Sequence, residues 1–403
     1  MTDRTKSWLE IPEGAPFGLH TLPYGVFSTE GEDPRVGAAV GDCVIDLAPL
    51  AAVEGLEGGH VFNQPSLNPF LALGRPAWEA VRGWLLELVT AESRRDLVEP
   101  HLVPLEATRL HMPFDVADYV DFYSCQAHAE NVGKIFRPDS PSLPTAWRHL
   151  PIGYHGRSAT VVPSGSEIVR PSGLRRAGDG VAFGPSTRLD IEAEVGFVVG
   201  APSELGRPVK VGEFADHVFG VVLVNDWSAR DIQAFEYVPL GPFLGKSFAT
   251  SVSPWVVPLS ALEHARVEPP ARDPEPAGYL VDTEPWGLDI RLEVEWNGTV
   301  VSRPPFADMY WTPAQQLAHL TVNGAAVRTG ELYASGTVSG TVKDECGSFL
   351  ELTWNGDDPV ILTDGSRRRF LEDGDAVTIR ATAPGPEGLP ISLGAVTGTI
   401  RPA

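Results

Sequence analysis

The chain has 403 residues, of which 43% are hydrophobic and 21% are charged, and its formal net charge is −22 at pH 7. A chain of this length predicts two domains rather than one small core. A net charge this negative is repelled by phosphate backbones and anionic lipid, which argues against binding to nucleic acid or to a membrane surface. No apolar run approaches the roughly 20 residues that a membrane span needs.

The cysteines and the N-terminal stretch indicate the cellular compartment of the protein. Cys43, Cys125 and Cys346 are too few and too scattered for a disulfide framework or a zinc site. The first residues, MTDRTKSWLEIPEG, contain no apolar core of the secretory kind. These features together predict a reducing, cytoplasmic compartment.

The first part of the chain, residues 1–116, predicts a domain without obvious chemistry. The stretches GVFSTEG and RVGAAVGDCVIDL are typical of short strands broken by glycine and aspartate turns. An amphipathic helix is expected to begin at Pro76. Its apolar residues at helical spacing are Trp78, Val81, Trp84, Leu85 and Leu88.

The second part, residues 117–403, is dominated by β patterns. Two segments alternate in polarity around an Asn-Gly pair, which predicts β-hairpins that turn at Asn297-Gly298 and at Asn355-Gly356. The stretch FLEDGDAVTIRATA predicts a further strand after an Asp-Gly turn. The remaining expectations are helices over residues 227–237 and 313–323 and a proline-rich excursion over residues 262–287.

A run of alternating carboxylates occurs in TRLDIEAEVGFVVG, residues 187–200. Asp190, Glu192 and Glu194 occupy every second position, so a β-strand places them on one face. Glu192 and Glu194 would then lie about 6.6 Å apart along the strand, close enough to lean around one hard cation. A solvated strand face is the alternative. The following VGFVVG, however, predicts burial on both faces, where carboxylates need a partner.

A second informative segment covers residues 219–258. Its apolar strand GVVLV delivers Asp226 to the strand end, where this residue is either the N-cap of the next helix or a metal ligand. In that helix Arg230 and Gln233 are three residues apart and share a face. Arg230 suits an anionic substrate group, or else it pairs with Asp226 at the i, i+4 spacing.

Other polar residues stand in apolar or glycine-flanked surroundings. Lys246, one of five lysines, either reaches solvent or stabilises a negative charge. His128 is a candidate general base or a structural histidine, and Tyr154 lies on a glycine-flanked loop suited to binding. Thr337 stands in the loop ASGTVSGT, and Glu351 alternates out of its apolar neighbours in FLELTW.

Several of these stretches occur in a characteristic order: DFYS, PIGYHGR, NDWSARDIQ, EYVPLGPFLGKSF, MYWT, ASGT and LEL. Together they resemble the fumarylacetoacetate hydrolase family. The resemblance covers most of the chain from about residue 110 and extends more weakly through the N-terminal part. The block from Asn225 to Ser247 is its longest and most specific portion.

The resemblance implies a mainly β (α+β) fold. An N-terminal SH3-like barrel would occupy residues 1–116, and a mixed β-sandwich roll, the catalytic domain, would occupy residues 117–403. It also implies a homodimer and a divalent cation, either Mg²⁺ or Ca²⁺. Asp190 falls on no ligand position of the family and is left with a structural role. The positions that correspond to cation ligands are Asp121, Glu192, Glu194 and Asp226, with the backbone of the Lys246 loop and Thr250 as further ones.

The activity implied by the resemblance is metal-dependent hydrolysis of the C–C bond of 4-fumarylacetoacetate. The products are fumarate and acetoacetate, and the reaction is the last step of tyrosine and phenylalanine catabolism. The general base falls on His128 and the acid that orients it on Glu351. The positions that bind substrate and stabilise negative charge are Arg230, Gln233 and Lys246, and those that hold its carboxylate and carbonyl ends are Tyr123, Arg137, Tyr154 and Thr337.

The sequence departs from the family pattern at Cys125, where the family has serine, and at Ala249, where it has glycine. Two other functions stay open at this point. One is hydrolysis, decarboxylation or hydration of an acylpyruvate-type oxo acid on the same metal scaffold, against which the length of the chain argues. The other is a non-catalytic calcium-binding β-module, which would leave His128, Glu351 and Lys246 without a use.

Overall fold

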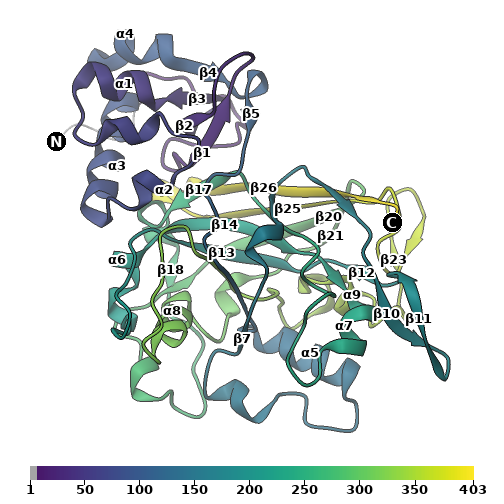
Figure 1. Ribbon diagram of the computed structural model, residues 1–403. Helices are drawn as coiled ribbons and strands as arrows, with labels where there is room; N and C mark the ends of the chain where they lie inside the picture. The colour runs from purple at the N-terminus through teal and green to yellow at the C-terminus, as the bar shows by residue number, and fades with distance from the viewer. Residues whose placement is uncertain (1–6) are drawn as a thin grey trace.

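Two β-sheets packed face to face form the centre of the molecule in a computed structural model that describes residues 7–403 (Figure 1). Residues 1–6, the start of the N-terminal stretch that lacks an apolar secretory core, lie outside the described residues. The larger sheet has 13 strands and the smaller has five. Most neighbouring strands are antiparallel, but three pairs, β6–β22, β8–β16 and β9–β26, are parallel, so both sheets are mixed.

The main path of the large sheet runs through ten strands, and three short strands pair beside it. In spatial order the ten are β4 (Leu102–Pro104), β3 (Cys43–Asp46), β2 (Arg35–Val40), β1 (Tyr24–Ser28), β17 (Trp255–Pro258), β14 (Val218–Asp226), β13 (Ala193–Val199), β22 (Leu332–Ala334), β6 (Tyr119–Phe122) and β7 (Gly153–His155). The three others are β5 (Arg109–Leu110), β8 (Val161–Pro163) and β16 (Thr250–Val252).

The smaller sheet, the two-stranded ribbons and the helices complete the fold. The smaller sheet is β21 (Thr299–Ser302), β20 (Arg291–Trp296), β25 (Ala376–Pro384), β26 (Pro390–Arg401) and β9 (Glu167–Val169). The ribbons pair β10 (Ser172–Ala177) with β11 (Gly180–Pro185), β12 (Leu189–Asp190) with β15 (Ser228–Ala229), β18 (Arg266–Val267) with β19 (Gly287–Leu288), and β23 (Val360–Ile361) with β24 (Arg367–Arg368). The helices are α1 (Leu47–Glu54), α2 (Asn68–Leu71), α3 (Arg75–Thr90), α4 (Arg95–Val98), α5 (Gln126–Phe136), α6 (Phe214–His217), α7 (Arg230–Glu236), α8 (Pro313–Thr321) and α9 (Phe349–Leu352).

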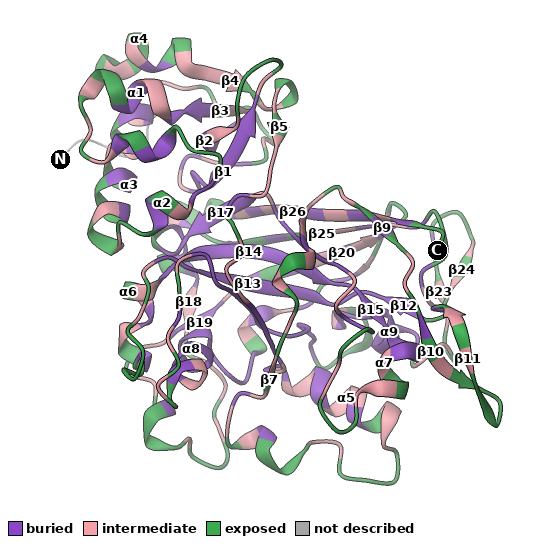
Figure 2. Ribbon diagram, in the orientation of Figure 1, coloured by how far each residue is buried: buried purple, intermediate pink, exposed green. Residues whose placement is uncertain are grey.

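The central strands β13 and β14 are buried along their whole length (Figure 2). One face of β13, with Val195 and Phe197, belongs to the core shared with the smaller sheet. The other face, with Val198, belongs to the core shared with the N-terminal strands and helices. The continuous apolar run therefore reflects two layers of packing, and the expected burial on both faces is confirmed.

The N-terminal strands extend the large sheet. One edge of β1 pairs with β2, and the other pairs with β17 and β5. Among residues 7–403 no pairing joins β4 to β5, so these strands form an open sheet. The SH3-like barrel expected in residues 1–116 is therefore not confirmed, whereas the mixed arrangement of sheets and helices is.

Several predicted elements are present where the sequence placed them. The hairpin at Asn297-Gly298 joins β20 to β21, and both turn residues have positive φ angles. The helix expected from Pro76 is α3, and the expected helices over residues 227–237 and 313–323 correspond to α7 and α8. Thr312 caps α8 through a reciprocal hydrogen-bond pair with Gln315, which explains where that helix begins.

The second predicted hairpin is wrong. Residues 349–352 form the helical turn α9 instead of a strand. The side chain of Ser348 accepts a hydrogen bond from the backbone N–H of Glu351, and the carboxylate of Asp190 accepts two more from the start of the turn. These acceptors, one of them remote in sequence, stabilise a helical turn over the alternating pattern.

The carboxylate-rich strand is also interrupted. β12 ends at Asp190 and β13 begins at Ala193, so Glu192 lies between two strands that pair with different partners. The expectation that residues 189–199 form one continuous strand is therefore wrong. Because of this interruption, Asp190 and Glu194 lie in different surroundings. Glu192 contacts Arg230, which also binds Asp190, and it contacts Lys246.

Replacing Phe219 tests the packing between β14 and the N-terminal part. Its ring lies 5.4–5.6 Å from the rings of Tyr24, Phe70 and Trp78. We expect Phe219→Ala to lower the free energy of unfolding by about 3–5 kcal/mol, because it leaves a cavity in this core. Leu205→Ala, at a side chain that is 85% exposed, should change it by less than about 0.5 kcal/mol. Urea unfolding measures both, and equal losses would contradict the packing role of Phe219.

Candidate active site

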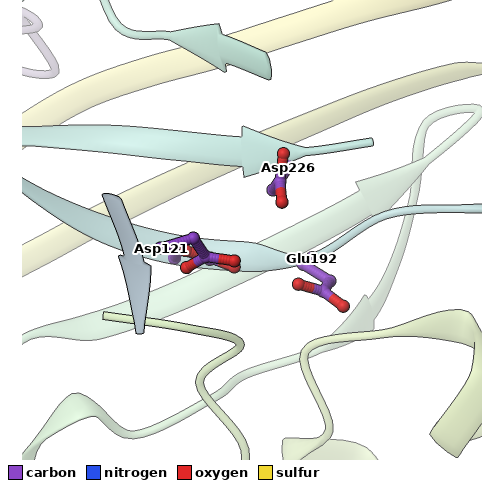
Figure 3. A group of neighbouring side chains, drawn as sticks. Asp121, Glu192 and Asp226 are labelled. Atoms are coloured by element: carbon purple, nitrogen blue, oxygen red, sulfur yellow. The ribbon is translucent and has the colours of Figure 1, made fainter. Parts of the chain in front are cut away.

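Four carboxylates from three segments of the chain meet at one end of the large sheet. Asp121, Glu192, Glu194 and Asp226 are all buried, and each offers an oxygen within 4.8 Å of those of the others. Strand pairing explains the meeting, because β6, β22, β13 and β14 are neighbours in the sheet. Figure 3 shows three of these side chains around a common space, with Asp226 at the end of its strand.

This cluster fits a hard divalent cation. Oδ1 of Asp121 and Oε1 of Glu194 are buried without any hydrogen-bond partner. Burial raises the pKa of both carboxyls well above their ordinary values, and the neighbouring Asp226 and Asp121 respectively raise them further. Unpaired buried carboxylate oxygens are costly, and carboxylate oxygens are the ligands that Mg²⁺ and Ca²⁺ prefer. The donor set therefore suits either ion.

Two buried, positively charged side chains contact the same cluster of carboxylates. Nζ of Lys246 lies 2.5 Å from Glu192 and 2.8 Å from Asp226. The guanidinium of Arg230 lies 2.7 Å from both Asp190 and Glu192. Burial alone would raise the pKa of Glu192, but Lys246 and Arg230 outweigh it and hold this pKa below its ordinary value. The structure thus places Lys246 inside the site, facing carboxylates rather than solvent.

Asp226 acts as an acceptor within the site. Its carboxylate accepts hydrogen bonds from the hydroxyls of Tyr154 at 2.9 Å and Thr250 at 2.6 Å. Helix α7 begins after Ala229 and has no side-chain cap. The N-cap alternative for Asp226 is therefore wrong. The pairing of Arg230 with Asp226 is also absent from the ion pairs of the described residues, where Arg230 contacts Asp190 and Glu192 instead.

A histidine–carboxylate pair lies near the cluster. Nδ1 of His128, on α5, is 2.7 Å from Oε2 of Glu351, on α9, and both residues are buried. Glu351 also accepts hydrogen bonds from Asn131, Ser339 and Ser348. Although burial raises the pKa of Glu351, His128 and these donors outweigh it, so the net shift is downward and the carboxyl is held ionised. An ionised carboxylate at this distance fixes the ring of a histidine and its tautomer.

A cleft of about 450 Å³ is bordered by Asp121 and Glu192 of the carboxylate cluster and by His128 of the histidine–carboxylate pair. Oγ1 of Thr337 is buried there without a hydrogen-bond partner, so it is free for a ligand. The cleft brings together every substrate-binding candidate of the sequence. Its lining includes Tyr123, His128, Arg137, Tyr154, Arg230, Gln233, Lys246 and Thr337, as well as Asp121 and Glu192.

Some residues near the site had not been singled out from the sequence. Tyr237 lines the cleft four residues after Gln233, a spacing that places both on one face of α7 and its C-cap. Asn131, three residues after His128 on α5, donates to Glu351. Both could have been found from helical spacing. Ser339 and Ser348 could not, because only the tertiary structure brings them to Glu351.

The two departures from the family pattern are accommodated inside the core. Cys125 precedes α5, and its thiol donates a hydrogen bond to the carbonyl of Ser339 at 3.0 Å. Burial raises the pKa of this thiol to about 12, so it stays neutral. Ala249 is also buried, and it packs in the core between the two sheets.

Comparison with known proteins identifies the family. Residues 119–401 match the domain described as "Fumarylacetoacetate (FAA) hydrolase C-terminal", and residues 20–113 match "Fumarylacetoacetase N-terminal". This chain belongs to the fumarylacetoacetate hydrolase family. It is 44% identical to fumarylacetoacetase of Homo sapiens, an alignment that covers 98% of this chain and 99% of the human protein. The Arabidopsis thaliana fumarylacetoacetase is 42% identical, with 99% of both chains covered.

Solved structures of two other hydrolases share the fold at lower identity. Fumarylacetoacetate hydrolase from Exiguobacterium antarcticum gives a TM-score of 0.55 at 17% identity, over 94% of this chain and 99% of that one. Maleylpyruvate hydrolase from Sphingobium gives 0.52 at 14% identity, over 94% of this chain and all of the other. Within residues 7–403, no helix is both long enough and apolar enough to cross a bilayer.

Cation binding can be measured through stability. After treatment with a chelator, added Mg²⁺ or Ca²⁺ should raise the melting temperature, because a ligand at 100 times its dissociation constant stabilises the folded state by about 2.7 kcal/mol. Scanning calorimetry records the shift. Glu194→Gln removes one ligand charge and should reduce it. Glu331→Gln alters a buried carboxylate outside the cluster and should retain it. A full shift in both variants would place the cation elsewhere.

Proposed function

We propose that this protein hydrolyses the C–C bond of 4-fumarylacetoacetate to fumarate and acetoacetate, as its fumarylacetoacetase relatives are named for doing. The observation that carries the proposal is the shared cleft. A fixed histidine, an acidic cluster suited to a cation and two buried cationic side chains all border the same 450 Å³ space. The similarity over nearly the full length of both chains supports the same activity.

His128 is the proposed general base. Because Glu351 holds Nδ1, the other ring nitrogen is left to take a proton from a water molecule in the cleft. That water attacks the ketone carbon of the fumaryl group, which becomes the second carboxyl of fumarate. Glu351 stabilises the imidazolium that forms, and it need not accept the proton itself. The C–C bond then breaks, acetoacetate leaves with the electron pair, and its carbon takes up a proton.

Arg230, Gln233 and Lys246 are the proposed groups that bind the substrate and stabilise the oxyanion. Nη2 of Arg230 has only a long contact, 3.4 Å, with the carbonyl of Ile191, so it is the least committed nitrogen of this guanidinium. A divalent cation held by the four carboxylates would supply Lewis-acid stabilisation of negative charge on the substrate oxygens. Mg²⁺ and Ca²⁺ are both proposed, with the Lys246 loop and Thr250 beside Asp226 as further ligand positions.

The remaining residues of the cleft are proposed to hold the ends of the substrate. Tyr123 and Arg137 lie on the α5 side, and Thr337 has its free hydroxyl there. Tyr154 approaches from β7. An Arg with hydroxyl donors is suited to a carboxylate group of the fumaryl end. Their places in the cleft and the family resemblance support these proposed roles.

We also propose a homodimer. The β10–β11 hairpin exposes Leu174, Val181 and Phe183, the last with 75% of its surface accessible. Apolar side chains gathered on one hairpin are typical of a protein interface. Light scattering coupled to gel filtration measures the mass in solution, and Phe183→Glu should shift it toward the monomer if this hairpin forms the interface.

We also propose a cellular compartment, a place in catabolism and a domain division for this protein. Three free cysteines are consistent with a reducing, cytoplasmic compartment, and the reaction would be the last step of tyrosine and phenylalanine catabolism. The division into residues 1–116 and 117–403 agrees with family matches that end at residue 113 and begin again at residue 119. The acylpyruvate alternative is tested by offering acylpyruvates in the same assay.

Loss of fumarylacetoacetate, followed by ultraviolet absorbance with and without a chelator, tests the activity. His128→Ala should lower kcat by about 10²- to 10⁴-fold at saturating cation, because no other group takes the proton from water. His60→Ala replaces an exposed histidine of the N-terminal part. It should leave kcat unchanged. Near-normal turnover by His128→Ala would exclude this residue as the base, and no turnover by the unaltered protein would exclude the activity.

A further inference from the structure

Asp190 is a fully buried carboxylate. It belongs neither to the cluster of four carboxylates that suits a cation nor to the lining of the cleft. Its Oδ1 accepts hydrogen bonds from the backbone N–H groups of Ile191 at 2.8 Å and Phe349 at 2.7 Å. Its Oδ2 accepts from the N–H of Leu350 at 3.0 Å and from Nε of Arg230 at 2.7 Å. Four donors from three segments of the chain therefore converge on one side chain.

One pair of these donors belongs to the turn that carries the candidate orienting acid. Phe349 and Leu350 open α9, and Glu351 is the next residue. The first N–H groups of a helix have no partner within it, and here Asp190 supplies the acceptors. The position of the turn, and with it the direction from which Glu351 reaches His128, depends on this contact.

A third donor belongs to the candidate oxyanion-stabilising group. Nε of Arg230 is held by Asp190, while its Nη1 donates to Glu192 at 2.7 Å and to Gln233 at 3.2 Å. A planar guanidinium bound at both Nε and Nη1 cannot rotate about its stem. Asp190 therefore sets which nitrogen of Arg230 turns toward the cleft.

We propose that Asp190 is a positioning residue that locks the Glu351–His128 pair and the Arg230 guanidinium into one fixed geometry around the substrate. The inference rests on the proposed function, since it assigns Asp190 a part in that reaction. Only a carboxylate offers acceptors on both atoms and no donor. In Asp190→Asn, one atom becomes an NH₂ group that faces two N–H donors, so either the turn or the arginine must move.

The test compares Asp190→Asn with the unaltered enzyme at saturating cation and fumarylacetoacetate. We expect kcat to fall by about 10- to 100-fold, because small misplacements of reacting groups are costly. KM should rise by a smaller factor than kcat falls, because Arg230 also binds the substrate, whereas the Glu351–His128 pair acts in the transition state. A loss confined to KM would overturn the proposal.

Asp375→Asn is the matched control. Asp375 is also a buried carboxylate with four donors, namely Trp296, Asn297, the backbone N–H of Glu372 and Nε of Arg368. It lies in the region of the smaller sheet and outside the cleft. Its replacement should lower the melting temperature without a comparable loss of kcat. Equal losses of kcat in both variants would mean that Asp190 contributes stability alone.

A double-mutant cycle with Glu351→Gln separates the two roles further. If Asp190 acts partly through Glu351, Asp190→Asn should cost less on the Glu351→Gln background than on the unaltered one. Asp375→Asn should cost the same factor on both. Full additivity with Asp190→Asn would overturn the proposed coupling.

A folding failure would not end the test. If Asp190→Asn does not accumulate as folded protein, Asp190→Ser leaves room for a water molecule to satisfy the donors without a rigid bridge, and the same loss of kcat is expected. Turnover by the unaltered enzyme together with normal kcat in both Asp190 variants overturns this inference alone. Absence of turnover in the unaltered enzyme overturns the proposed function as well.

Discussion

The site depends on the burial of four carboxylates within 4.8 Å of one another. Like charges at this separation in a dry environment repel strongly, and desolvation disfavours each ionised form. The chain offsets part of this cost with Lys246 and Arg230, both of which bind Glu192. Oxygens of Asp121 and Glu194 still have no partner. A bound dication is the group that would satisfy them, and this requirement organises everything around the cleft.

The rest of the architecture holds that cluster in place. The two central strands are packed on both faces, so their ends are rigid and fix the acidic side chains that they carry. The described residues of the N-terminal part, 7–116, contribute nothing to the cleft lining. This part packs against the face of β13 and β14 that carries Val198 and Val224, and thereby excludes water from the strands that bear the ligands. Its effect on chemistry is indirect, through burial.

Two polar systems share the cleft, and a hydrogen-bonded bridge connects them. In the proposed reaction, His128 and Glu351 form the side that transfers protons, whereas the acidic cluster with Lys246 and Arg230 forms the side that stabilises charge. Asp190 contacts the backbone of the turn that carries Glu351 and the arginine that contacts Glu192. In the proposed arrangement, a carboxylate outside the cleft lining thus holds the two sides at a fixed relative position.

Local spacing is enough to predict the helix from Pro76, the buried strand GVVLV and the Asn297-Gly298 turn. The family is also evident from the sequence, because long motifs such as NDWSARDIQ can be recognised without knowledge of the fold. The tertiary structure supplies the strand order β14, β13, β22, β6 that brings Asp121 beside Asp226, two residues that the family resemblance already assigned to one cation. It likewise decided that residues 349–352 are helical, because the acceptor that stabilises them is Asp190, a residue remote in sequence. Non-local hydrogen bonds of this kind leave no periodic trace in the chain, so only the folded structure shows them.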